Sequence, residues 1–168
     1  RIMPTGTFKR GERTLTITPA DLQQMAENYT NGRPRWKIPI YPGHPTENQP
    51  DPPALGYVTK LEVKPDGLYA VPEFDDGKEE TIRGYRYNSP GVLWKKNGSE
   101  YKDENGQAFD NIVDHVALSN KPFFGQHTQL FSADPEVETF LDKQTHTLAT
   151  IRGMIQKLLD AIQSAVAP

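Results

Sequence analysis

The sequence has no cysteine among its 168 residues. That absence excludes a disulfide framework, a thiolate nucleophile and a zinc site built on cysteine, and it makes a reducing cytoplasm the compartment that we expect. Long hydrophobic runs are also missing, since no apolar stretch reaches the length of a membrane span or of a signal-peptide core. We therefore expect a soluble protein with no membrane partner.

An excess of basic residues is absent too. The chain has 19 Lys and Arg against 22 Asp and Glu, mixed along its length, so no basic stripe is present to neutralise nucleic-acid phosphates and no nucleic-acid partner is predicted. The mean hydropathy of −0.70 is polar for a compact domain, and together with 15 prolines it indicates exposed loops or an extended tail. The chain opens with Arg1 rather than methionine, which we expect of a trimmed or processed product.

The first third of the chain predicts strands around one helix. Residues 13–17 alternate polar and apolar side chains, as a half-buried strand does. Thr18 is a good N-cap and Pro19 suits the first helical position, so a helix should begin there and end at Asn31-Gly32. Residues 36–41 predict a short strand whose proline implies a sheet edge or a bulge.

The next part of the chain alternates extended segments with turns. Lys64-Pro65-Asp66-Gly67 is a turn sequence between two hydrophobic runs, which indicates a hairpin. In chain order we expect an exposed loop at 45–53, strands at 54–63 and 68–74, a short polar helix at 78–83, a strand at 85–93, a charged loop at 95–106 and a strand at 112–118.

The C-terminal residues follow a different period. From Ala133 onward the apolar residues are spaced by threes and fours, which predicts a long amphipathic helix at 136–166 that packs on the domain or on a partner helix. We divide the chain into a domain at 1–125, a linker at 126–135 and this helix. The apolar stripe consists of Val137, Leu141, Leu148, Ile151, Ile155, Leu158 and Ile162.

Three residues stand in local contexts that suit catalysis: His44 in Tyr-Pro-Gly-His-Pro, Ser89 in Tyr-Asn-Ser-Pro-Gly and His115 in Asp-His-Val-Ala-Leu. A serine hydroxyl becomes a nucleophile only beside a base, and the base works best when a third group orients it. Each residue also has a simpler explanation. His44 could be a loop histidine, Ser89 the end of a strand and His115 a core histidine bonded to a backbone carbonyl.

Asp114 is the alternative to His115 as the orienting group, because a carboxylate orients an imidazole better than a second imidazole does. Successive strand residues point to opposite faces, so only one of the two is expected to face His44. Acidic residues between Glu73 and Glu80 match no calcium-loop spacing and are expected to be solvated. His127 and His146 lack partners at metal-ligand spacing. We therefore predict no metal and no cofactor.

Five sequence blocks occur in order over roughly residues 1 to 125. They are Pro39-Ile-Tyr-Pro-Gly-His-Pro45, Ala54-Leu-Gly-Tyr-Val58, Gly67-Leu-Tyr-Ala70, Tyr87-Asn-Ser-Pro-Gly91 and His115-Val-Ala-Leu-Ser-Asn-Lys-Pro122. Together these blocks resemble the I-protein proteases of Mu-like phages. That family is similar to the phage prohead proteases and, in fold, to the herpesvirus assemblins. The resemblance implies an α+β, mainly β fold, with a small β-barrel surrounded by short helices.

The resemblance also implies a function, that of a capsid maturation serine protease. His44 falls on the first histidine of the family and Ser89 on its nucleophile, while His115 falls where many prohead proteases have a glutamate and assemblins a second histidine. The implied substrates are the scaffold protein, the major capsid protein and the protease itself, cleaved inside the procapsid in the host cytoplasm. A homo-oligomer formed through the barrel or the C-terminal helix is expected. Residues 133–168 would be the start of a scaffold coiled coil.

Pro90 restricts the expected mechanism. It has no N–H, so the residue after the nucleophile cannot donate to an oxyanion. The donor must come from the backbone at Ser89 or Gly91, or from the turn at 120–125. Two alternatives remain open at this stage. One is a catalytically inactive scaffold or assembly module of the procapsid, and the other is a binding module that uses the proline-rich loop at 45–53, which lacks a Pro-x-x-Pro motif with a basic neighbour.

Overall fold

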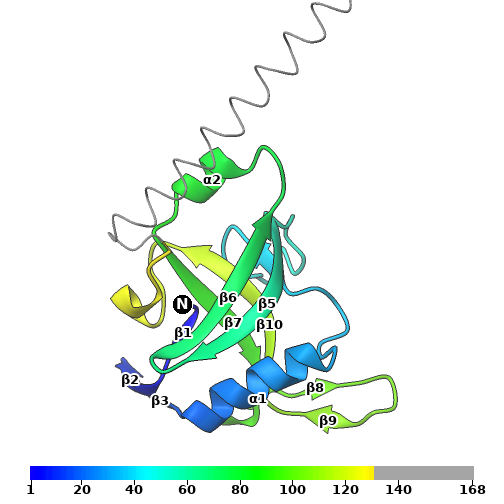
Figure 1. Ribbon diagram of the computed structural model, residues 1–168. Helices are drawn as coiled ribbons and strands as arrows, with labels where there is room; N and C mark the ends of the chain where they lie inside the picture. The colour runs from blue at the N-terminus through cyan, green and yellow to red at the C-terminus, as the bar shows by residue number, and fades with distance from the viewer. Residues whose placement is uncertain (131–168) are drawn as a thin grey trace, which may run out of the picture. The chain divides into compact units, whose positions relative to one another are not determined.

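A six-stranded sheet, in the order β1-β6-β5-β4-β10-β7, dominates the computed structural model, which describes residues 1–130 (Figure 1). β10 runs parallel to β4, and the other neighbours in the sheet are antiparallel. The predicted helix at 136–166 lies outside the described residues, as does the second half of the linker, 131–135. The six strands are β1 (Met3–Pro4), β4 (Pro39–Tyr41), β5 (Gly56–Lys64), β6 (Gly67–Phe74), β7 (Tyr87–Leu93) and β10 (Ile112–Ser119).

The two outer strands of the sheet approach each other, so the sheet is barrel-like and nearly closed. Asn88 in β7 donates its side-chain amide to the carbonyl of Arg1, just before β1, at 3.2 Å. The end of the described chain also lies along the start of β7, where Leu130 donates its backbone N–H to the carbonyl of Arg86. The mainly β fold expected from the sequence is confirmed.

Helix α1 (Pro19–Thr30) begins and ends where the sequence predicts. The Thr18 side chain accepts from the backbone of Asp21, whose carboxylate accepts from the Thr18 backbone, so a capping box holds the first turn. Leu22 and Met25 are buried on the inner face. The Tyr29 hydroxyl donates to a β5 carbonyl at 2.5 Å, which fixes the helix across one end of the β5–β6 hairpin (Figure 1).

Two small antiparallel ribbons flank the main sheet. β2 (Gly6–Arg10) pairs with β3 (Arg13–Ile17), and β8 (Tyr101–Lys102) pairs with β9 (Ala108–Phe109). The β8–β9 ribbon involves part of the segment that the sequence predicts as a charged loop, so that prediction is partly wrong. Strands of two residues are too short to give a periodic pattern. The remaining elements are α2 (Glu79–Arg83) and two 3-10 helices at Lys95–Asn97 and Gly125–Thr128.

The expectation of a sheet edge or a bulge at Pro39 is wrong, because β4 lies between β5 and β10. Pro39 lies opposite Tyr57 in β5. On either side of it, the carbonyls of Ile38 and Ile40 accept hydrogen bonds from the backbone N–H groups of Val58 and Leu55, at 2.9 and 2.7 Å. These two bonds do not require an N–H from the proline.

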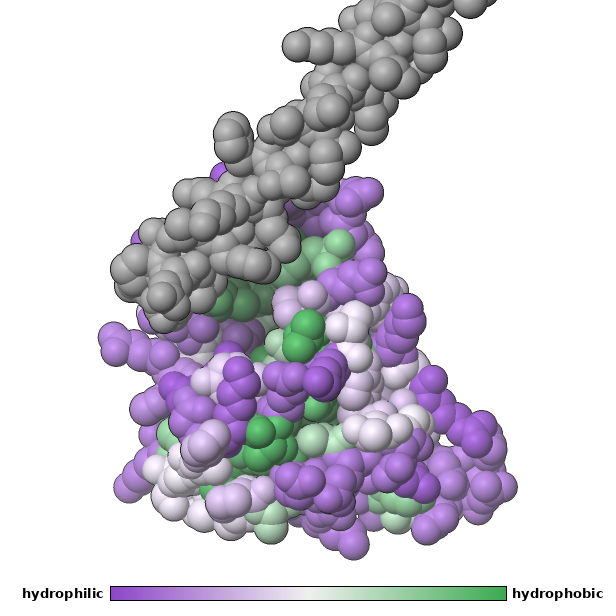
Figure 2. All heavy atoms as spheres, viewed as in Figure 1, coloured by the Kyte–Doolittle hydropathy of each residue, from purple (hydrophilic) through white to green (hydrophobic). Residues whose placement is uncertain are grey.

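The hydrophobic core fills the space between α1, the main sheet and the β2–β3 ribbon. Burial of these side chains provides the main driving force for folding. On the face shown in Figure 2, hydrophobic side chains form small patches among hydrophilic ones. The largest side chains under 2% exposed are Met3, Ile17, Leu22, Met25, Ile38, Leu68, Ile112 and Leu118.

Candidate active site

His44 lies just beyond the end of β4, on a turn that the local sequence shapes. Gly43 adopts a φ of 129°, a conformation that residues with a side chain rarely adopt, so the chain can turn sharply after Pro42. The Tyr85 hydroxyl donates to the carbonyl of Pro42 at 3.1 Å and holds this turn from the opposite side. The turn thus presents His44 from a supported backbone.

Ser89 and His115 come from neighbouring antiparallel strands. Ser89 in β7 pairs with Ala117 in β10, and Gly91 pairs with His115, so the serine and the histidine are two residues apart in the ladder. Residues at this offset lie on the same face of a sheet. Both are buried, with 5% of Ser89 and 9% of His115 exposed.

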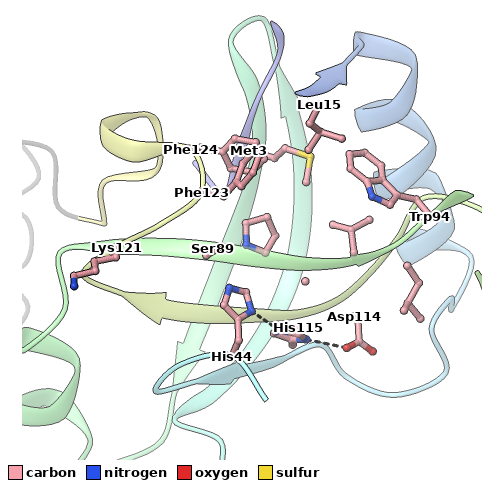
Figure 3. A pocket seen from close by; sticks show the side chains of 14 residues that line it. Met3, Leu15, His44, Ser89, Trp94, Asp114, His115, Lys121, Phe123 and Phe124 are labelled. Carbon is pink, nitrogen blue, oxygen red and sulfur yellow. Dashed lines mark hydrogen bonds and ion pairs between the residues drawn. The ribbon is translucent and has the colours of Figure 1, made fainter. Parts of the chain in front are cut away.

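A bulge in β10 changes the relationship of Asp114 to His115. The register shifts between Val113 and His115, which leaves Asp114 as an extra residue without a partner in β7. Bulges re-aim side chains, and here the Asp114 carboxylate lies 2.8 Å from His115 Nδ1. His115 Nε2 in turn lies 2.9 Å from His44 Nδ1 (Figure 3). The structure therefore brings both third-residue candidates into one chain of hydrogen bonds, with His115 in contact with His44.

This chain of hydrogen bonds determines where the protons lie. An ionised carboxylate only accepts, so His115 must donate from Nδ1 to Asp114. In neutral His115 the other nitrogen, Nε2, is then an acceptor, and His44 donates to it from Nδ1. Because neutral His44 carries its one ring proton on Nδ1, its Nε2 has no proton. The ring edge opposite His115 faces the stretch of β7 that carries Ser89 (Figure 3).

The surroundings of His44 favour its neutral form. Although the residue is exposed at the rim of the site, partial burial lowers the pKa of His44 below 6.5, and the nearby charge that His115 can carry lowers this pKa further. A neutral imidazole with a free Nε2 is able to accept a proton at neutral pH.

The four side chains line one open cavity of about 440 Å³ (Figure 3). No hydrogen bond joins the Ser89 hydroxyl to His44 among the described residues, and such contacts often tighten only when substrate binds. The Lys121 amide at the cavity wall is already bonded to the Ser119 hydroxyl, which removes one of the predicted oxyanion donors. The apolar part of the wall consists of Met3, Leu15, Pro90, Val92, Leu93, Trp94, Phe123 and Phe124.

The sequence suggests Gly91 as an oxyanion donor through its backbone, but it does not reveal that the missing side chain of Gly91 makes room for His115. Gly91 lies beside Ser89 in the same cavity, and its α-carbon is covered by the ring of His115. A glycine after a Ser-Pro pair suggests only a turn or a strand end when read alone. Gly91 makes room for the ring because it pairs with His115 across the two strands. That pairing depends on how β7 and β10 align, which the local sequence does not show.

Within residues 1–130 no group of three or more His, Asp or Glu side chains is placed to hold a metal ion. No helix in the same part of the chain is long and apolar enough to cross a membrane. The acidic side chains between Glu73 and Glu80 are exposed, as the sequence predicts.

Comparison with protein families adds an independent observation. Residues 1–131 match the family model described as the Mu-like prophage I protein, N-terminal domain. The chain belongs to the Mu-like prophage I protein family. The resemblance found in the sequence is therefore confirmed at the level of the family, and a phage-related role follows from it. No curated protein and no solved structure matches the chain.

Proposed function

We propose that this Mu-like prophage I protein is a serine endopeptidase that cleaves scaffold or capsid proteins, and itself, during procapsid maturation. The observation that carries the proposal is the chain of hydrogen bonds from Asp114 through His115 to His44, in one cavity with Ser89. A base oriented in this way beside a buried hydroxyl is the arrangement that acyl transfer requires.

In the proposed mechanism, the Ser89 hydroxyl oxygen attacks the carbonyl carbon of a peptide bond and His44 Nε2 takes the hydroxyl proton. The tetrahedral intermediate collapses as His44 returns this proton to the leaving amine. Water then attacks the acyl carbon as His44 takes a water proton, and the acyl–oxygen bond to Ser89 breaks as His44 passes that proton to the Ser89 oxygen, which releases the second product. His44 Nε2 takes and returns the proton in every step, and it is free to do so because the hydrogen bond to His115 uses the other ring nitrogen, Nδ1.

His115 and Asp114 act together in this scheme. His44 becomes an imidazolium when it takes the proton, and a neutral histidine alone stabilises that cation less than a carboxylate does. Asp114 lies on the far side of His115 and accepts a hydrogen bond from it. The negative charge of its carboxylate helps to stabilise the His44 imidazolium. We therefore assign His115 as the residue that orients His44, and Asp114 as the residue that fixes the tautomer of His115.

The cavity favours a polypeptide substrate. β7 is an outer strand of the sheet, and the cavity is lined by Ser89 and the residues that follow it in this strand. An extended peptide can align with such a strand and bring a carbonyl to the hydroxyl. The apolar wall gives uncharged side chains next to the scissile bond a place to pack.

A cleavage assay tests the proposal. The protein expressed from its complete gene is incubated with the scaffold and major capsid proteins of the same phage, and products are identified by mass spectrometry. We expect discrete cleavage by the wild type and none by Ser89→Ala, whose circular dichroism spectrum should be unchanged. Cleavage that persists in Ser89→Ala would disprove the assignment.

A catalytically inactive assembly module is the second candidate function. Its support is that no hydrogen bond joins Ser89 to His44 among the described residues. This alternative predicts that a serine-directed fluorophosphonate leaves Ser89 unlabelled. The proposed protease predicts labelling.

A further inference from the structure

A second cavity, of about 610 Å³, adjoins the candidate active site. Asp114 lines both cavities, and Pro45, which follows His44 directly, is part of the wall of the second. We call this second cavity the aromatic groove, because its lining includes Trp36, Tyr41 and Tyr57. Further lining comes from prolines of the 45–53 loop, namely Pro45, Pro50, Pro52 and Pro53.

The aromatic groove exposes large rings to solvent. Trp36 is 43% exposed and Tyr57 is 38% exposed, whereas Tyr41 is buried at 8%. The position of Trp36 is fixed, because its indole N–H donates to the backbone carbonyl of Asp114 at 3.4 Å and its ring packs edge-on against Tyr101. Exposed aromatic faces on a rigid support are a feature of binding surfaces.

The aromatic groove continues into a third cavity, of about 400 Å³, with which it shares Lys37 and Tyr57. The third cavity adds Glu73, Asp75 and Asp76 to its lining. A path therefore runs from Ser89 past Asp114 and Tyr57 to the end of β6. Several residues of an extended peptide could follow this path, since each spans about 3.3 Å.

Carboxylates dominate the charge along this path. The aromatic groove and the third cavity together are lined by five carboxylates against the single ammonium of Lys37. The ion pairs of the described residues leave Asp51, Glu73, Asp75 and Asp76 without a basic partner. Burial first, then the Asp51 hydrogen bond and the charges of Asp51 and Asp114, raise the pKa of Tyr41 to about 12. The two charge contributions are those expected where carboxylates line the aromatic groove.

We propose that the aromatic groove binds a Lys- or Arg-rich segment of the polypeptide substrate on one side of the scissile bond. Lys and Arg stack on the faces of aromatic rings and pair with carboxylates, and the aromatic groove offers both kinds of partner in one place. The inference rests on the proposed protease function, because it names the substrate segment that the same site would recognise.

The test measures peptide binding by fluorescence anisotropy with the full chain carrying Ser89→Ala, so that no peptide is cleaved. The probes are labelled peptides of about twelve residues, long enough to follow the path, with lysines in one and glutamines at the same positions in the other. We expect the lysine peptide to bind about tenfold more tightly, with an advantage that shrinks as salt is added.

Two triple variants show where the lysine peptide binds. Asp51→Asn, Glu73→Gln and Asp75→Asn remove charge from the path, while Glu12→Gln, Glu27→Gln and Glu100→Gln remove the same charge from other exposed positions. Asparagine at position 51 can still accept from the Tyr41 hydroxyl, so the loop contact is retained. We expect the first variant to abolish the tenfold preference and the second to retain it.

Equal binding of the two peptides, or an equal loss in both triple variants, would overturn the proposal. Fluorophosphonate labelling of Ser89 in the otherwise unmodified chain separates this inference from the function on which it rests. Labelling without peptide preference removes the binding inference and leaves the protease. Peptide preference without labelling removes the protease and leaves a peptide-binding surface.

Discussion

The imidazole of His115 lies directly over the α-carbon of Gly91. A β-carbon at position 91 would lie 2.1 Å from His115 Cε1 and 2.5 Å from its Nδ1, well inside contact distance. Glycine at this position lets the ring lie close against β7, where its Nε2 meets His44 Nδ1. The absence of a side chain at one residue therefore allows the orienting contact at another.

Gly91→Ala should displace His115 and disconnect it from His44. We expect peptide cleavage to fall by about a hundredfold, as expected for a misplacement of about 1 Å in a catalytic group. The overpacking should lower the free energy of unfolding by about 1 to 3 kcal/mol, measured by chemical denaturation. Gly84→Ala is the control, since its φ is −70° and the added β-carbon would lie 3.2 Å from the Thr81 carbonyl oxygen. Full activity in Gly91→Ala would contradict the described contact.

Asp114→Asn should disturb the proton positions while preserving the shape of the site. An amide nitrogen can donate to His115 Nδ1, which moves the His115 proton to Nε2 and reverses the hydrogen bond to His44. We expect kcat/KM to fall by about a hundredfold, because general-base catalysis from His44 is lost.

The imidazole nitrogen chemical shifts of His115 distinguish this effect from a structural one. They should report the Nδ1-protonated tautomer in the wild type and the Nε2-protonated tautomer in Asp114→Asn. Asp114→Glu should recover part of the activity, because it restores a carboxylate. Unchanged nitrogen shifts in Asp114→Asn would remove Asp114 from the scheme.

The pKa of His44 determines the acid limb of the pH profile. Burial and the charge of His115 lower this pKa below 6.5, so kcat/KM should rise to its plateau with a midpoint below 6.5.

The lowered pKa of His44 also affects the stability of the fold. The unfolded chain binds this proton more readily than the folded one, so stability decreases as the pH falls below 6.5 and levels off below the folded pKa. NMR titration of His44, assigned with His44→Gln, measures the midpoint, and a value above 6.5 would be inconsistent with the site.

Asp21 connects the start of α1 to the segment after β7. Its carboxylate accepts from the Thr18 backbone at 2.7 Å and from Lys96 Nζ at 2.5 Å. Burial opposes ionisation, yet these bonds outweigh it and lower the pKa of Asp21 below 3.8. Asp21→Ala should reduce the free energy of unfolding by about 1 kcal/mol at pH 7. In the wild type this contribution is present above pH 3.8 and is lost as the pH falls through the folded pKa, so the two proteins should converge in acid.

Local sequence predicts the features of this fold that local forces determine. The capping residue Thr18 and the Asp66-Gly67 turn act on their immediate neighbours, and both helix and hairpin form where expected. The short contexts around His44, Ser89 and His115 likewise indicate these three residues as candidates.

Long-range pairing determines the features that local sequence does not reveal. The bulge at Asp114 is defined by the pairing of β10 with β7. The sequence of β10 alone does not show which residue lacks a partner in the neighbouring strand. Strict alternation along residues 112–118 predicts that only one of Asp114 and His115 faces His44, whereas the structure links both to it in one chain of hydrogen bonds. The interior place of β4 and the role of Gly91 depend in the same way on which strands become neighbours.

Intact mass spectrometry after fluorophosphonate treatment tests the central claim most directly, because it asks whether His44 activates Ser89 without requiring a known substrate. We predict a single adduct on the wild-type chain, mapped by peptide analysis to Ser89, absent from Ser89→Ala and strongly reduced in His44→Ala. An unlabelled wild type, or an adduct at any other residue, would contradict the account.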